Sequence, residues 1–220
     1  MDFIKILAAM LPFLPGFVTP TTSVPKITPT AEVYFLPHQD DEMFMAGSIK
    51  RSVDAGHEVY AVLVTDGSQS RVLEYLKKKY YPLTREEFSV ARDRELLDSL
   101  VKLGLPSSHV YFAHSTAHEL LDQVYKDGRL TEVEAARLVD FFYKQFGNQA
   151  TYITLISSRT HRQHSDHYAL SQALLHDVQI QRKRFFSEDP HLGQLVSLSK
   201  VELAAKQQAL RAYSVWDPKR

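Results

Sequence analysis

The sequence contains no cysteine among its 220 residues, which excludes disulfide bonds, thiolate catalysis and cysteine-ligated zinc. Any metal site must therefore be built from histidine, aspartate, glutamate and water. An excess of either charge is also lacking, because 26 Lys and Arg residues balance 26 Asp and Glu residues. Nucleic-acid-binding domains usually carry a basic patch or stripe, so we expect no nucleic-acid partner.

Long apolar runs are few, and the one at the N-terminus is interrupted. Residues 3–18 ("FIKILAAMLPFLPGFV") are mostly apolar, but Pro12 and Pro15 break the run, which is too short for a stable transmembrane span. With the Pro/Thr-rich linker that follows, residues 1–30 have the layout of a secretory signal peptide. We therefore expect a periplasmic or secreted protein with one domain at 31–220; the alternatives are a membrane-surface anchor or a docked arm on a cytoplasmic protein.

After the linker, short apolar runs alternate with helical patterns. This alternation predicts βαβ units and hence a single Rossmann-like α/β domain of three layers with a mostly parallel sheet. Three helix starts carry a capping box, in which Ser or Thr is followed three residues later by Glu. We expect strands at 32–36, 57–65, 109–113, 151–156 and 194–198, helices at 41–55, 84–104, 131–147, 166–184 and 199–213, a partly helical loop at 68–83, and a solvated helix end at the basic run 181–184.

Polar clusters follow three of these strands. They lie at 38–42, 65–67 and 157–167, which are distant in sequence. In parallel sheets, ligands bind beyond the carboxyl ends of the strands. We therefore expect the three clusters to converge in one site.

The first and last clusters have the spacing of metal ligands. His38 and Asp41 are three residues apart at a strand-to-helix turn, and His164 and His167 are three apart at a helix start, on one face. Two imidazoles and a carboxylate with a fourth position open are typical of a catalytic zinc site. Acids in the first turn also stabilise a helix by about 0.3–1 kcal/mol, but such capping does not explain the histidines.

These residues resemble a known family, the zinc-dependent N-acetylglucosaminyl deacetylases (PIG-L/LmbE-like). The motif "PHQDDE" at 37–42 is similar to the family's (A/P)HPDDE, and "HSDH" at 164–167 is similar to HxDH. Weaker matches are "GHEV" at 56–59, "TDG" at 65–67, the pair Arg92 and Glu95, and "KQQALRAYS" at 206–214. The resemblance covers about residues 31 to 214.

The resemblance implies an LmbE-like fold, bound Zn²⁺, and an N-acetylated amino sugar or glycoconjugate as substrate. It implies zinc held by His38, Asp41 and His167 and, as catalytic residues, Asp40 as general base, His164 at the oxyanion and Asp166 orienting a histidine. Arg92 would lie near the substrate, and we assign Asp66 and Tyr168 to the same substrate side.

The chain departs from the family pattern at two places. Gln39 replaces the usual proline, which removes no ligand, so the metal site should survive. After the third strand, where the family often has an acidic residue, this sequence reads "FAHSTAHE". His114 and His118 in this segment either lie at the pocket rim or are ordinary loop residues. His161 could compete as a ligand, and a loop role is the alternative. Nothing in the sequence fixes an oligomeric state.

Two other classes of protein fit part of the pattern. A noncatalytic ligand-binding α/β domain, with a structural metal or none, would share the fold without the hydrolysis. A phospho-receiver-like module also has paired acids after its first strand, but that fold is much shorter and leaves Glu42, His164 and His167 without a role.

Overall fold

A parallel sheet of five strands forms the centre of the protein. The computed structural model describes residues 30–79, 82–114, 125, 127–157, 165–187, 189 and 191–216. The strand order is β3-β2-β1-β4-β5 and every pairing is parallel. The strands are β1 (Ala31–Leu36), β2 (Glu58–Leu63), β3 (Val110–Phe112), β4 (Thr151–Leu155) and β5 (Lys183–Phe186). The expected Rossmann-like α/β fold is thus confirmed.

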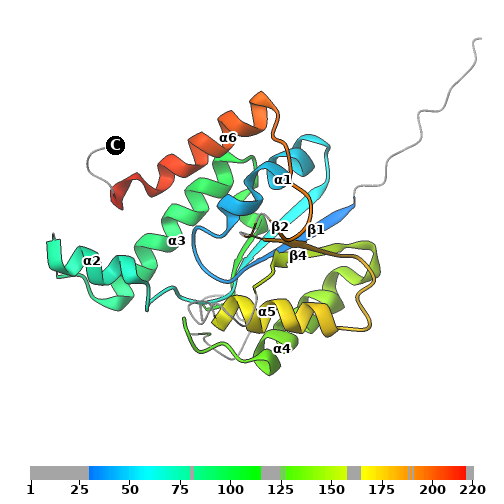
Figure 1. Ribbon diagram of the computed structural model, residues 1–220, viewed down its shortest axis with the longest axis horizontal. Helices are drawn as coiled ribbons and strands as arrows, with labels where there is room; N and C mark the ends of the chain where they lie inside the picture. Colours follow the sequence, from blue (N-terminus) through cyan, green and yellow to red (C-terminus); the bar gives the residue numbers. More distant parts are fainter. Residues whose placement is uncertain are drawn as a thin grey trace, which may run out of the picture.

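Helices cover both faces of this sheet and make the outer two layers (Figure 1). One face packs against α1 (Glu42–Asp54), α3 (Arg85–Lys102) and α6 (Lys200–Leu210), and the other against α4 (Glu132–Phe146) and α5 (Ser165–His176). The remaining helices are α2 (Arg71–Lys79) and the 3₁₀ helices η1 (Ser107–His109), η2 (Gly147–Gln149) and η3 (Arg211–Trp216). No helix in these described parts is long and apolar enough to cross a membrane.

The apolar run of β1 explains why it is the central strand. Successive side chains of a strand point to opposite faces. Tyr34 and Leu36 enter the core under α1, α3 and α6, while Val33 and Phe35 enter the core under α4 and α5. All four are fully buried. The neighbours β2 and β4 lie on either side of β1, so the chain reverses its winding between β1 and β4, where ligands bind in such sheets.

Three helices begin with the expected capping boxes. Thr84, Thr131 and Ser199 each accept a hydrogen bond from the backbone amide of the Glu three residues later, and that Glu accepts one from the cap's own amide. Each box satisfies two amides that a helix start would otherwise leave unpaired. These boxes explain why the starts of α3, α4 and α6 were correctly predicted.

We expect Ser199→Ala to lower the free energy of unfolding by about 1 kcal/mol, the usual cost of losing an N-cap side chain. The amide of Glu202 would lose its acceptor, the Ser199 hydroxyl at 3.2 Å. Ser199→Asp should stay near wild type, because Asp caps equally well. Urea denaturation measures both variants, and an equal loss in both would contradict the assignment.

The helix expected at 166–184 is wrong in its second half. The helix α5 ends at His176, where no glycine or proline marks a stop, and Asp177 then turns the chain by accepting amides of Gln179 and Ile180. The basic run 181–184 is not a helix end. Its last two residues, Lys183 and Arg184, begin β5, an edge strand, where lysine is common. Lys183 also donates to the carbonyl of Leu175 at 3.0 Å and so caps the helix that precedes it.

The prediction of a strand at 194–198 is also wrong. This segment is neither helix nor strand. Leu198 instead packs on Gly47 of α1, and the carbonyl of Ser197 accepts from Arg51 of the same helix at 3.2 Å. The segment therefore crosses α1 instead of extending the sheet.

Two other expectations have different outcomes. The partly helical loop at 68–83 contains a helix of nine residues, α2, whose Leu73 and Leu76 pack against Phe88 of α3. Residues 1–29 lie outside the described residues, so the signal peptide, the linker and export remain predictions.

Candidate metal centre

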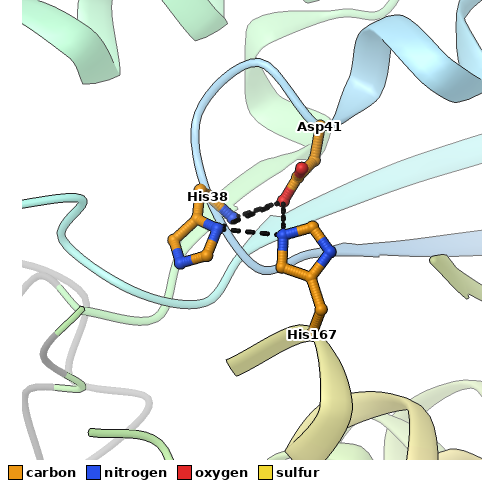
Figure 2. A group of neighbouring side chains, drawn as sticks. All are labelled: His38, Asp41 and His167. Carbon is orange, nitrogen blue, oxygen red and sulfur yellow. Dashed lines mark hydrogen bonds and ion pairs between the residues drawn. The ribbon is translucent and has the colours of Figure 1, made fainter. Parts of the chain in front are cut away.

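The three residues expected to bind metal converge at the carboxyl ends of β1 and β4. His38 and Asp41 lie in the turn between β1 and α1, and His167 lies in the first turn of α5. Figure 2 shows the three side chains pointing toward one another, two from the turn and one from the facing helix. Asp41 and His167 are buried, and His38 is partly exposed.

The distances between the three ligand atoms fit a tetrahedral metal ion. The Nδ1 atom of His38 lies 3.1 Å from Nε2 of His167, Oδ2 of Asp41 lies 3.3 Å from Nε2 of His167, and 3.6 Å separate Oδ2 from Nδ1 of His38. Tetrahedral ligands at the usual Zn–N and Zn–O lengths are about 3.3 Å apart. Two imidazole nitrogens and a carboxylate oxygen at these separations make a set of donors that a cation would hold together.

The other ring nitrogen of His38 faces two carboxylates. Its Nε2 lies 3.1 Å from Oδ2 of Asp166 and 3.2 Å from Oδ1 of Asp127. Asp166 is itself fixed, because its two oxygens accept the amides of Gly128 at 2.6 Å and Leu130 at 3.0 Å. A carboxylate on the far nitrogen fixes the tautomer of a metal-binding histidine and leaves its near nitrogen free to ligate.

Asp127 is a site residue that the sequence analysis missed. It follows a stretch without helical or strand periodicity, and an Asp-Gly pair is also typical of an ordinary turn. Its Oδ2 accepts the amide of Gln69 at 2.8 Å, and its own amide donates to Oδ1 of Asp66 at 3.0 Å. Asp66, which also accepts the amide of Ser68, therefore holds Asp127 beside the ring of His38.

A second group of possible ligands consists of His38, Asp127 and Asp166. The oxygens of Asp166 already accept two backbone amides, and the ring nitrogen that faces both acids is placed as a hydrogen-bond donor. These contacts favour a supporting role for the two acids. The group of His38, Asp41 and His167 is therefore the better metal site.

The charges of these groups depend on one another. Burial opposes the charged form of His38, but hydrogen bonds to Asp127 and Asp166 and the charge of Asp41 together raise its pKa well above the ordinary value. Burial likewise opposes the charge of Asp41, yet the charge and hydrogen bond of His167 lower its pKa. A metal ion that bound here would compete with a proton for Nδ1 of His38.

Asp40, the expected general base, occupies an unusual backbone conformation. Its φ is 96°, and it is the only residue other than glycine with positive φ in the described part of the chain. Such conformations cost about 1–3 kcal/mol and concentrate at functional sites. Its side chain is 54% exposed, and Arg92 donates to its Oδ2 at 2.6 Å. Asp40 is thus adjacent to the candidate metal ligand Asp41 but open to solvent.

Glu42, the third acid of the motif, begins α1 as expected but is not a solvated helix-start residue. It is fully buried. Its Oε1 accepts hydrogen bonds from Ser99 at 2.6 Å and Tyr213 at 2.5 Å, and its Oε2 accepts the amide of Asp40 at 3.1 Å. Burial raises the pKa of Glu42 to about 7, against the hydrogen bonds of Ser99 and Tyr213.

The two places at which the chain departs from the family pattern, Gln39 and His114, both contact Asp93. Gln39 is buried, and its side-chain amide donates to Oδ1 of Asp93 at 2.8 Å, while Nε2 of His114 lies 3.2 Å from the same oxygen. The Gln39 side chain also covers Gly67, where an added Cβ would lie 2.0 Å from its Oε1. Among the described residues, the contacts of the Gln39 side chain are thus with Asp66, Gly67 and Asp93, and none is with the three candidate ligands.

The remaining candidates have mixed outcomes. Arg92 and Glu95 form an ion pair of 3.2 Å, and both residues are buried. Arg92 donates to the carboxylate of Asp40. Asp66 accepts the amide of Asp127. Tyr168 is half-buried and follows His167 in the sequence. The substrate roles of Arg92, Asp66 and Tyr168 stay predictions. His164, His161 and His118 lie outside the described residues, and so does the predicted oxyanion contact.

Comparison with known families identifies a match over most of the domain. Residues 33–177 match the PIG-L model, described as GlcNAc-PI de-N-acetylase. A comparison with curated protein sequences gave no significant match.

Solved structures with the same fold share little sequence with this chain. N,N'-diacetylchitobiose deacetylase from Pyrococcus horikoshii superposes with a TM-score of 0.61 at 18% identity, over 86% of this chain and 72% of that one. Teicoplanin deacetylase Orf2, solved in a zinc-inhibited form, has a TM-score of 0.61 at 16% identity over 84% of each chain. GalB, the 4-carboxy-2-hydroxymuconate hydratase of Pseudomonas putida KT2440, has a TM-score of 0.56 at 13% identity, over 86% of this chain and 80% of that one. At these identities the likeness concerns the fold.

Proposed function

Because the chain belongs to the PIG-L family, we propose that it is a metal-dependent hydrolase that removes an acetyl group from an N-acetylated amino sugar or glycoconjugate. The observation that carries this proposal is the convergence of His38, Asp41 and His167 with Asp40 beside them. A noncatalytic binding domain has no use for a solvent-exposed carboxylate held in a strained backbone next to three convergent ligands.

His38, Asp41 and His167 would hold the metal, for which zinc is the proposed ion. A bound zinc ion would lower the pKa of water to about 7 and would polarise the acetamide carbonyl. Asp166 and Asp127 would hold the remaining proton of His38 on Nε2, because both accept from that ring nitrogen, so Nδ1 is the atom that would face the metal. The charge of the site then depends on residues from three separate segments of the chain, at 38–41, 127 and 166–167.

Asp40 would act as the general base. Its exposed carboxylate would take a proton from the water that attacks the acetamide carbon, and would return a proton to the departing amine, so that acetate and a free amine are released. Arg92 would hold the carboxylate in place through the contact of 2.6 Å. His164, as the family resemblance implies, would donate a hydrogen bond to the developing oxyanion, a contribution typically worth about 10² to 10³ in rate.

Removal of the metal tests this proposal. Treatment with a chelator, followed by dialysis, should abolish acetate release from N-acetylglucosamine conjugates and leave the far-UV circular dichroism spectrum nearly unchanged. Added zinc should restore activity at about one equivalent. The fold should survive because the two apolar cores lie on the faces of the sheet and not at the metal ligands.

Two results would contradict the proposal. Acetate release that persists after complete metal removal would exclude metal dependence. A folded, zinc-loaded protein that releases no acetate from any N-acetylated sugar, yet binds one of them, would favour the noncatalytic binding domain.

A further inference from the structure

The strained backbone of Asp40 is held from two sides. On one side, Oε2 of Glu42 accepts the amide of Asp40 at 3.1 Å. On the other, a single nitrogen of Arg92 donates to the carbonyl of Gln39 at 2.7 Å and to Oδ2 of Asp40 at 2.6 Å. A residue with positive φ keeps that conformation only when its surroundings fix it firmly. Glu42 and Arg92 are therefore the groups that determine where the Asp40 carboxylate lies.

Glu42 is in turn fixed by two distant elements. Ser99 of α3 and Tyr213 of η3 both donate hydroxyl hydrogen bonds to its Oε1, at 2.6 and 2.5 Å. Glu42 and Ser99 are fully buried and Tyr213 is 9% exposed. A buried carboxylate that loses one of its donors is poorly satisfied and shifts toward other partners. The position of Glu42 therefore depends on both hydroxyl groups.

Tyr213 touches both of the groups that hold Asp40. Its hydroxyl donates to Glu42, and the guanidinium of Arg92 lies over its ring at 4.8 Å from the centroid. Arg92 also forms an ion pair with Glu95 on the same helix. One side chain from the C-terminal 3₁₀ helix thus supports the amide and the carboxylate of Asp40 at once.

We propose that Tyr213 is a positioning residue for the catalytic base, acting through Glu42 and Arg92 on Asp40. The C-terminal helix η3 is then part of the catalytic apparatus and not only a cover for the core. This inference rests on the proposed function, because it assigns a role in the step that Asp40 performs.

The experiment compares two variants that each remove one buried tyrosine hydroxyl. Tyr213→Phe keeps the ring beneath Arg92 and removes only the donor to Glu42. Tyr34→Phe is the matched control, because Tyr34 is fully buried in β1 and its hydroxyl donates to Glu32 at 2.7 Å. Steady-state acetate release is measured for both variants, together with zinc content and thermal unfolding.

We expect Tyr213→Phe to lower kcat by about 10- to 100-fold, the scale of a small misplacement of a catalytic group. KM and zinc content should stay near wild type, because no metal ligand is changed. Tyr34→Phe should keep the wild-type kcat even if its melting temperature falls as much. Equal kcat values in the two variants would overturn the inference.

A double-mutant cycle separates positioning from general loosening of the site. In an Asp40→Asn background, Tyr213→Phe should cause no further loss of kcat, because the group on which it acts is gone. A further loss of the same size as in the wild-type background would overturn the inference. If Tyr213→Phe fails to fold, Ser99→Ala removes the other donor to the same oxygen, and the same pattern is expected.

Failure of this inference differs from failure of the proposed function. If Asp40→Asn is inactive while Tyr213→Phe is as active as Tyr34→Phe, Tyr213 is merely structural and the hydrolase assignment stands. If Asp40→Asn retains wild-type turnover, or the wild-type protein releases no acetate, the proposed function fails and the positioning role fails with it.

Discussion

Asp40→Ala is expected to lower kcat for acetate release by about 10² to 10⁴-fold, the contribution typical of a positioned general base. Zinc content should remain close to one ion per chain, because Asp40 is not among the three convergent ligands. The side chain is 54% exposed and paired with Arg92, so it is accessible to water yet fixed in direction. Initial-rate assays and metal analysis of the same preparation provide the measurement.

Two further variants make this result specific. Asp40→Asn keeps the shape of the side chain and tolerates positive φ, but cannot accept a proton, so it should be as slow as Asp40→Ala. Asp98→Ala removes an equally exposed acid, 55% accessible, from the outside of α3 and should be fully active. Near-wild-type turnover by Asp40→Asn would show that the carboxylate is not the base.

His167→Ala is expected to have the larger effect, because it removes a ligand and with it the metal. Among the three ligand atoms, its Nε2 lies nearest to each of the other two, at 3.1 Å from Nδ1 of His38 and 3.3 Å from Oδ2 of Asp41. Loss of the ion removes water activation and carbonyl polarisation together, so the fall in kcat should exceed that of Asp40→Ala. Metal analysis after gel filtration should find no tightly bound zinc.

The matched control is on the same helix. His176→Ala removes the exposed histidine at the last position of α5 and should keep both zinc and activity. A His167→Ala protein that keeps stoichiometric zinc and normal turnover would mean that the ion is bound elsewhere, for example by the group that contains Asp127 and Asp166.

The sequence predicted well those parts of the fold in which one segment carries its own signal. The strands β1, β2 and β4 are apolar runs between turn residues, and three helix starts have capping boxes. The strand β5 was missed because "KRFF" is a charged edge strand with only four residues, and its partner β4 is far away in sequence. The end of α5 was missed because an Asp177 turn, and no glycine or proline, stops the helix.

The same distinction applies to the site. The convergence of the two motifs was predictable, because both follow strands at the same edge of the sheet, and the family resemblance selected His38, Asp41 and His167 among their residues. Asp127 was not predictable, since it lies in a connection without periodicity and gains its role only from the contact with His38. The contact of Glu42 with Tyr213 spans 171 positions, and no local pattern indicates it.

Metal analysis of the full-length protein, purified without added metal and then titrated with zinc, is the experiment that separates a hydrolase from a binding domain. Close to one zinc ion per chain, with acetate release from an N-acetylglucosamine conjugate rising in proportion to zinc, is the predicted result. A folded protein that takes up no zinc on titration would contradict the metal centre formed by His38, Asp41 and His167, and with it the hydrolase.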